Sequence, residues 1–163
     1  MDVAGTPEVI VAGVDGSVSG RAALLWALDE AAHSGRRVRA VRVWDPAPLF
    51  APPAPVFEVR ATVRGDEQAV LEDDLASVTV PQGVRLEGEL LEGPVVDTLV
   101  TASRGAAMLV VGSHGHRVLG RLALGSVSTG CTRRADGPVV VVTPPLGRRR
   151  TAAAGESAAR PLR

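Results

Sequence analysis

Short valine-rich runs, spaced by segments of helical character, constrain the fold of this chain more than any other feature. Four of them are mostly apolar: residues 9–14, 38–44, 108–111 and 139–142. Such runs are typical of strands buried on both faces of a parallel sheet. A fifth run, residues 84–91, alternates apolar and charged side chains, which indicates a half-exposed edge strand. The chain therefore supplies five strands.

Helical segments fill the intervals between these strands. The expected ranges are about 20–33, 65–80, 94–104 and 126–134. Ser17 or Ser19 can cap the first helix, and Gly35 ends it. Pro94 suits the first position of the third helix, because its fixed φ is already helical. The proline-rich stretch 45–55 is interpreted as a long loop, since the regular elements resume beyond it.

The second and fourth helices carry more specific expectations. For the second, one face is expected to point inward and the other outward. The inward residues would be Val70, Leu71, Leu75 and Val78, and the outward ones Glu67, Glu72, Asp73 and Asp74. Ser126 is expected to act as the N-cap of the fourth helix. Gly130 lies inside that helix, at a cost of roughly 1 kcal/mol relative to alanine.

This order of elements predicts one doubly wound α/β domain over residues 8–145, with a five-stranded parallel sheet and helices on both faces. The 163 residues, 45% of them hydrophobic, suffice for a single core. Residues 1–7 and the arginine-containing segment 146–163 are expected to be disordered. In such sheets, ligands bind beyond the carboxyl ends of the strands, where the strand order reverses.

Composition narrows the function classes. The formal net charge is zero, so bulk electrostatic capture of nucleic acid or of an acidic membrane is not expected. No apolar run is long enough to cross a bilayer, and no signal-peptide pattern opens the chain, which predicts a cytoplasmic protein. The single cysteine, Cys131, allows no intramolecular disulfide. All 18 basic residues are arginine, which excludes phosphate binding through a lysine.

A glycine-punctuated loop joins the fourth strand to the last helix. Its pattern is Gly112-x2-Gly115-x9-Gly125-Ser126. Glycines let the backbone approach a ligand closely, and the free N–H groups at a helix N-terminus attract negative charge. This loop therefore predicts a phosphate site. Asp15, at the end of the first strand, would face the same crevice if the first and fourth strands are neighbours.

The spacing of this loop, together with Gly13-Val-Asp15-Gly-Ser17, resembles the universal stress protein family, in particular its ATP-binding branch. The likeness runs from Val9 to Val142. It implies an adenine-nucleotide α-hydrolase-like sheet of order 3-2-1-4-5 and a bound ATP, with Mg²⁺ possible alongside the nucleotide. The family pattern implies these nucleotide-binding residues: Gly13, Asp15, Val43, Gly112, Ser113, His114, Gly115, His116, Arg117, Val118, Gly125, Ser126 and Val127.

Simpler interpretations stand beside each of these. Asp15 and Ser17 could form an ordinary strand exit and helix cap, and Val43 could be a core valine whose role rests on the resemblance alone. His114 and His116 lie two residues apart, but no Cys, Asp or Glu within ten residues completes a metal-ligand set. No protein-bound metal is therefore expected.

Three functions remain open from the sequence. The favoured one is an ATP-binding stress-response regulator, without catalytic residues, whose occupancy tunes dimer or partner contacts. The others are an enzyme of the adenine-nucleotide α-hydrolase group, acting by adenylation or slow ATP hydrolysis, and an interaction module without nucleotide. The bare edge of Val139–Val142 favours a homodimer through that strand.

Overall fold

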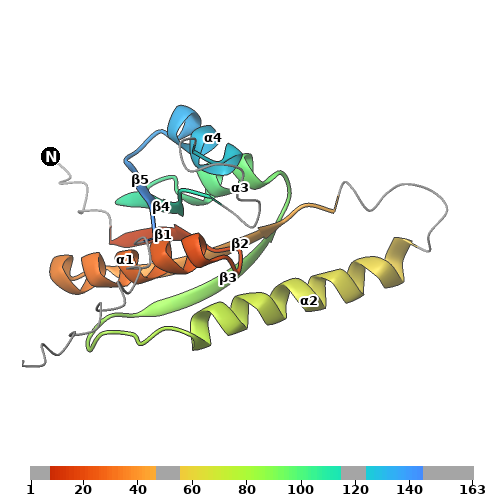
Figure 1. Ribbon diagram of the computed structural model, residues 1–163, viewed down its shortest axis with the longest axis horizontal. Coiled ribbons are helices and arrows are strands. Elements are labelled where there is room, and N and C mark those ends of the chain that lie inside the picture. The colour runs from red at the N-terminus through yellow and green to blue at the C-terminus, as the bar shows by residue number, and fades with distance from the viewer. Residues whose placement is uncertain (1–7, 47–55, 115–123, 145–163) are drawn as a thin grey trace, which may run out of the picture.

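The computed structural model describes residues 8–46, 56–114 and 124–144, and the side chains of residues 56–60 are not part of that description (Figure 1). Strands and helices alternate strictly along the described chain. In order they are β1 (Val9–Gly13), α1 (Val18–Ser34), β2 (Arg37–Trp44), α2 (Val56–Ala76), β3 (Leu86–Glu92), α3 (Val95–Ala102), β4 (Met108–Gly112), α4 (Ser126–Arg134) and β5 (Val139–Val142). The predicted succession of elements is confirmed.

The five strands form one parallel sheet of order β3-β2-β1-β4-β5, as expected. The order reverses between β1 and β4, which pair directly from Ile10 with Met108 to Ala12 with Val110. β3 and β5 are the two edges, as their sequences indicated. The carboxyl ends of β1 and β4 therefore open the crevice in which doubly wound proteins bind their ligands.

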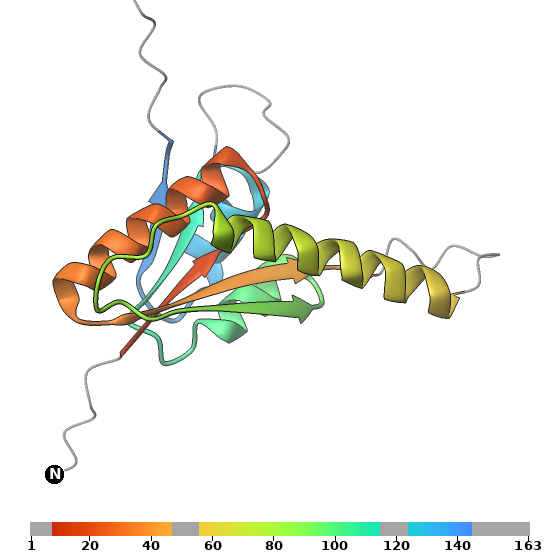
Figure 2. The same cartoon turned by 90° about the horizontal axis from the view of Figure 1, so that it is seen from below.

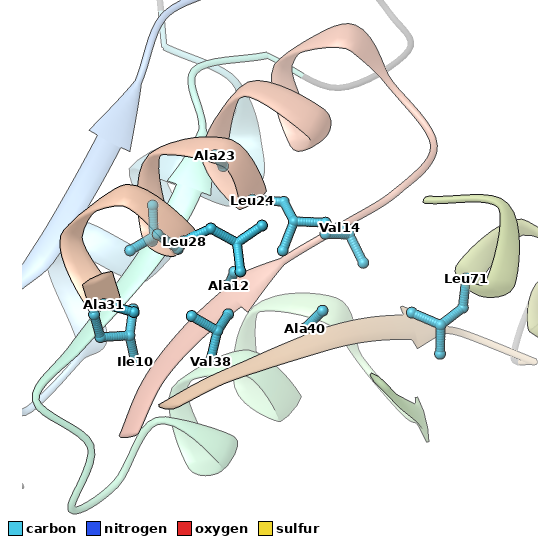
Figure 3. Packing of buried hydrophobic residues seen from close by; sticks show 12 residues of the cluster. Ile10, Ala12, Val14, Ala23, Leu24, Leu28, Ala31, Val38, Ala40 and Leu71 are labelled. Carbon is cyan, nitrogen blue, oxygen red and sulfur yellow. The ribbon is translucent and has the colours of Figure 1, made fainter. Parts of the chain in front are cut away.

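Two helices cover each face of the sheet. In Figure 2, α1 and α2 lie in front of the strands, and α3 and α4 lie behind them. The core on the α1 side includes Ile10, Leu24 and Leu28 (Figure 3). The core on the α3 side includes Val11 and Leu109 and is rich in valine. Alternate residues of one buried strand thus feed two separate cores, which explains the nearly continuous apolar runs.

α2 differs from its predicted range. The helix begins directly after the proline-rich stretch, nine residues before the expected start at Gly65, and ends at Ala76 rather than residue 80. β-Branched residues cost a helix only a few tenths of a kcal/mol each, so the segment before Gly65 can extend it. At the other end, Val80 precedes Pro81, and that position disfavours helical backbone. The amino-terminal half of α2 extends beyond the strand ends (Figures 1 and 2).

α4 packs closely on α3, and Gly130 makes that approach possible. A Cβ at Gly130 would lie 2.8 Å from a methyl carbon of Val96. The expected cost of a glycine inside this helix is therefore offset by close helix packing. Cys131 is fully buried, and burial raises the pKa of its thiol. At the start of α3, Pro94 is the N-cap and not the first helical residue, a shift of one position from the prediction.

Candidate functional site

A pocket of about 340 Å³ lies at the carboxyl ends of β1, β2 and β4 and at the start of α4. It is the place at which the strand order reverses. Its lining residues come from six elements and the turns beside them: Gly13, Val14, Asp15, Gly20, Val41, Val43, Val95, Leu99, Val111, Gly112, Ser113, His114, Gly125, Ser126, Val127 and Ser128.

The structure brings together nine of the thirteen residues that the sequence nominated for nucleotide binding. The nine that line this pocket are Gly13, Asp15, Val43, Gly112, Ser113, His114, Gly125, Ser126 and Val127. The other four, Gly115, His116, Arg117 and Val118, lie outside the described residues. Segments more than a hundred residues apart in sequence therefore meet at one cavity.

The start of α4 is open toward this pocket. Gly125 is the N-cap in extended conformation, and no side chain of the described residues caps the helix. The expectation that Ser126 is the cap is wrong, because Ser126 is already the first helical residue. Ser128 donates its hydroxyl to the carbonyl oxygens of Ser113 and Gly125, at 3.3 and 3.0 Å. The first N–H groups of the helix therefore have no side-chain acceptor there.

Backbone hydrogen bonds fix the end of β4 against this helix start. The amide of Ser113 donates to the carbonyl of Val142 at 2.8 Å, and the amide of Gly125 donates to the carbonyl of Ser113 at 2.8 Å. Ser113 is buried, and its Oγ lies 3.0 Å from Nδ1 of His114. The Nε2 atom of His114 is buried and has no hydrogen-bond partner among the described residues. His114 thus presents a polar atom that a ligand could satisfy.

Two glycines at the strand ends serve different purposes. A Cβ at Gly112 would lie 2.6 Å from the backbone of Ser19, so this glycine is needed for α1 to pack on β4. A Cβ at Gly13 would make ordinary contacts of 3.4 Å with Leu99 and Val111. Gly13 therefore keeps the floor of the pocket open, whereas Gly112 mainly sets the position of α1.

The turn after β1 is held by side-chain hydrogen bonds. Oδ1 of Asp15 accepts from the amide of Ser17 at 3.0 Å and from its hydroxyl at 2.5 Å. Ser17 in turn caps α1, because its Oγ accepts from the amide of Gly20 at 3.0 Å. The cap predicted from sequence is confirmed. Asp15 combines this structural task with a position on the pocket wall.

Asp74 was placed on the solvent face of its helix, and that prediction is wrong. Its side chain is 2% exposed, and its Oδ2 accepts from the amide of Gly16 at 2.9 Å. Glu67 is also half-buried, beside Arg42. Asp74 follows Leu71 by three residues, so both share one face of α2. This spacing could have indicated that Asp74 faces inward, but an acidic side chain is ordinarily expected in solvent.

The pocket also has an apolar wall that the sequence did not single out. Val41, Val95, Leu99 and Val111 join Val43 there. They come from β2, α3 and β4, and all of them belong to the core between the sheet and the α3 layer or pack against it. As apolar residues at buried positions, they carried no sign of a binding role. The site thus pairs an apolar wall with a rim of backbone amides.

A metal centre built by the protein is not seen in this part of the chain. The described residues contain no group of three or more His, Cys, Asp or Glu side chains able to hold a metal ion. Within those residues, no helix combines the length and the apolar character needed to cross a membrane.

Comparisons with known proteins agree with this geometry. A family model described as "Universal stress protein family" matches residues 7–143. A universal stress protein of Mycolicibacterium smegmatis is 33% identical over 141 residues, which cover 82% of this chain and 47% of that protein. The chain thus spans about half the length of the curated relatives that it matches.

Two solved structures extend the likeness to three dimensions. A protein of the universal stress protein family from Burkholderia pseudomallei is 28% identical, with a TM-score of 0.63 over 86% of this chain and 98% of that one. A universal stress protein in complex with cAMP is 27% identical, with a TM-score of 0.61 over 85% of this chain and 98% of that one.

Proposed function

Since this chain belongs to the universal stress protein family, we propose that its pocket binds ATP, with Mg²⁺ shared by the phosphates, and that occupancy tunes its contacts with a second copy or a partner. The observation that carries this proposal is the pocket at the reversal of strand order. Its volume of about 340 Å³ is within the range of small-molecule sites.

The two sides of the pocket suit the two ends of an adenine nucleotide. β2 and β4 flank β1 on opposite sides. Val41 and Val43 therefore lie on one side of Gly13, and the start of α4 lies on the other. An apolar wall favours a planar base, and open helix N–H groups favour phosphate. Gly13, without a side chain, leaves room between them.

The resemblance adds two finer assignments. The backbone of Val43 would recognise the adenine edge, and residues 112–118 and 125–127 would surround the phosphates. His114 supports the second assignment, because it lines the pocket and its buried Nε2 has no hydrogen-bond partner among the described residues. A solved relative that holds cAMP supports an adenine ligand in general. The choice of ATP rests on the resemblance of the glycine pattern to the ATP-binding branch of the family.

We propose binding and not turnover as the primary activity. Phosphoryl transfer requires several charged groups around the γ-phosphate. Among the described residues, the pocket is lined by one carboxylate, that of Asp15, and by no arginine. The test is a turnover assay: release of AMP and pyrophosphate with an acceptor substrate would favour the enzyme hypothesis instead.

The binding proposal is tested by calorimetry with ATP and Mg²⁺, and with cAMP, AMP and GTP as competitors. We expect one adenine-selective site per chain. Gly13→Val, which fills the pocket floor, should weaken ATP at least about tenfold, equivalent to 1.4 kcal/mol. Gly137→Ala is the matched control, because a Cβ there meets nothing within 4 Å. Absence of heat with every nucleotide, and no nucleotide released on denaturation, would contradict the proposal.

The dimer remains part of the proposal. β5 is an edge strand that pairs only with β4 among the described strands, and its four valines are all partly exposed. An edge of this kind can pair antiparallel with its copy through a two-fold axis. Light scattering should give twice the chain mass, and Val140→Lys, at this edge, should give a monomer. If the wild-type chain is a monomer at high concentration, the proposed dimer is wrong.

A further inference from the structure

One hydrogen bond joins α2 to the turn that borders the pocket. Oδ2 of Asp74 accepts from the amide of Gly16 at 2.9 Å, across 58 residues of sequence. We propose that Asp74 is a positioning residue of the nucleotide site: it fixes the turn between β1 and α1 and so couples α2 to occupancy of the pocket. For its ligand, this inference rests on the proposed function.

The turn that Asp74 holds requires a backbone conformation that few residues other than glycine adopt. Gly16 has a φ of 78°, in the left-handed region that favours glycine. Its neighbour Asp15 lines the pocket and orients Ser17, which caps α1. Gly20, the residue that receives this cap, also lines the pocket. A displaced Gly16 amide would therefore move both the carboxylate at the pocket wall and the first turn of α1.

The carboxylate of Asp74 is an unusual group at such a position. It is 2% exposed, and aspartate is almost never so buried without partners. Burial raises the pKa of this carboxyl, whereas the hydrogen bond from Gly16 and the charges of Arg21 and Arg42 lower it. The nearby charge of Asp15 raises it further. Burying a carboxylate costs free energy, and the hydrogen bond from the Gly16 amide is a role that would explain why an acidic residue stands here.

A second charged contact attaches α2 to the sheet close by. Both Nε and Nη2 of Arg42, on β2, lie 2.6 Å from Oε2 of Glu67. The Arg42 side chain is only 12% exposed. α2 is therefore held by two partly buried polar contacts, one to β2 and one to the pocket turn. Its position is specified by directional bonds as well as by apolar packing of Leu71.

The proposed coupling between the pocket and α2 connects the two faces of the sheet. The apolar wall of the pocket belongs to the α3 layer, whereas α2 lies with α1 on the opposite face (Figure 2). Asp74 reaches the pocket turn at the edge where β1 ends. Coupling free energies are reciprocal, so a ligand that orders this turn also stabilises the contact on α2. Nucleotide occupancy would then be felt on a helix that does not touch the nucleotide.

The test uses the full chain and three variants. Asp74→Ala removes the acceptor, Asp74→Asn keeps a carbonyl oxygen in the same place, and Asp73→Ala is the control on an exposed neighbouring position. If Asp74→Ala does not fold, Asp74→Leu replaces it, because leucine fills the space without an acceptor. The first readout is amide hydrogen exchange without nucleotide, and the second is ATP affinity by calorimetry.

We expect Asp74→Ala to speed exchange of the Gly16 amide at least tenfold more than exchange of the β1 amides, and to weaken ATP about tenfold. Asp74→Asn should restore most of both, and Asp73→Ala should match wild type. Equal loss of protection throughout the core would overturn the proposal, since it would mark a merely structural role. An exposed Gly16 amide with unchanged ATP affinity would overturn the coupling. If wild type binds no nucleotide while the Gly16 amide responds as expected, the positioning role stands and the proposed ligand fails.

Discussion

The two helices that begin at the pocket, α1 and α4, start in opposite ways. α1 is closed by Ser17, whose Oγ accepts from the amide of Gly20. α4 begins at Gly125, and none of the described side chains caps it. Both follow central strands, and both first turns line the same cavity. The difference indicates a division of labour, in which one helix start secures the fold and the other is left for a ligand.

The two turns beside the pocket also differ in whether side chains or backbone groups hold them in place. The turn after β1 is fixed by the side chains of Asp15, Ser17 and Asp74. The junction of β4 and α4 is fixed mainly by backbone, through Ser113 and Gly125. Backbone hydrogen bonds do not depend on side-chain identity, so the stability of this junction should change little on most single substitutions. The other side should respond to single side-chain changes.

The largest loss of stability is expected from a substitution at Gly112, where α1 packs on β4. Gly112→Ala places a methyl group 2.6 Å from the backbone of Ser19, so α1 must shift away from β4. We expect a loss of about 3 kcal/mol in the free energy of unfolding, measured in urea. Gly137→Ala is the control, with open space around it. A loss below about 0.5 kcal/mol would mean that α1 can move freely on the sheet.

A direct comparison of the two helix starts comes next. Ser17→Ala removes the cap of α1 and a partner of Asp15, and should cost about 1.5 kcal/mol of unfolding free energy. Ser126→Ala, at the first residue of α4, should cost less than about 0.5 kcal/mol, because Ser126 caps nothing. Equal costs for the two variants would break the distinction between a closed and an open helix start.

The contribution of the turn after β1 to stability should also depend on pH, through Asp74. Because burial raises the pKa of Asp74 above its ordinary value of 3.8, the folded chain binds more protons than the unfolded chain just above that pH. The contribution of Asp74 to stability therefore falls as the pH rises from about 3.8 through the raised pKa. Asp74→Asn lacks this loss. Urea titrations from pH 4 to 7 should show the variant gaining stability relative to wild type as the pH rises; a constant difference would contradict the burial of a charge there.

The smallest change in stability is expected when the open helix start is closed. Gly125→Ser supplies a capping hydroxyl at a residue with a φ of −62°, which serine accepts. Its Cβ would lie 3.2 Å from the carbonyl oxygen of Ser113, which is tight. The free energy of unfolding should change by no more than about 0.5 kcal/mol. ATP affinity should nevertheless fall, because the new hydroxyl would accept a hydrogen bond from N–H groups that the phosphates would otherwise bind. Unchanged affinity would mean that the phosphates bind elsewhere.

Much of the fold was accessible from the sequence, because strands buried on both faces leave apolar runs such as residues 108–111 that have few other interpretations. The sequence offered Ser17 or Ser19 as the cap of α1 and the structure has Ser17, whereas the cap predicted at Ser126 was one residue too late. The start of α2 was missed, since weak local propensities before Gly65 do not decide a helix boundary. These outcomes separate what local chemistry determines from what packing determines.

The site divides in the same manner. The glycine pattern gathered Gly112 and Gly125 at one pocket, because each marks a place where backbone comes close to another group. Val95 and Leu99 could not be nominated, since a pocket wall and a core use the same residue types. Asp74 was missed for the opposite reason: an acidic residue is expected in solvent, and only the contact with Gly16, from a distant segment, gives it a buried partner.

Amide chemical shifts of the isotope-labelled chain, titrated with ATP and Mg²⁺, show whether the open start of α4 holds the nucleotide phosphates. We expect saturable shifts that are largest at residues 126–128 and distinctly smaller at Gly20 of α1, whose amide is capped by Ser17. Shifts confined to α1, or none at saturating ATP, would contradict phosphate binding at the start of α4.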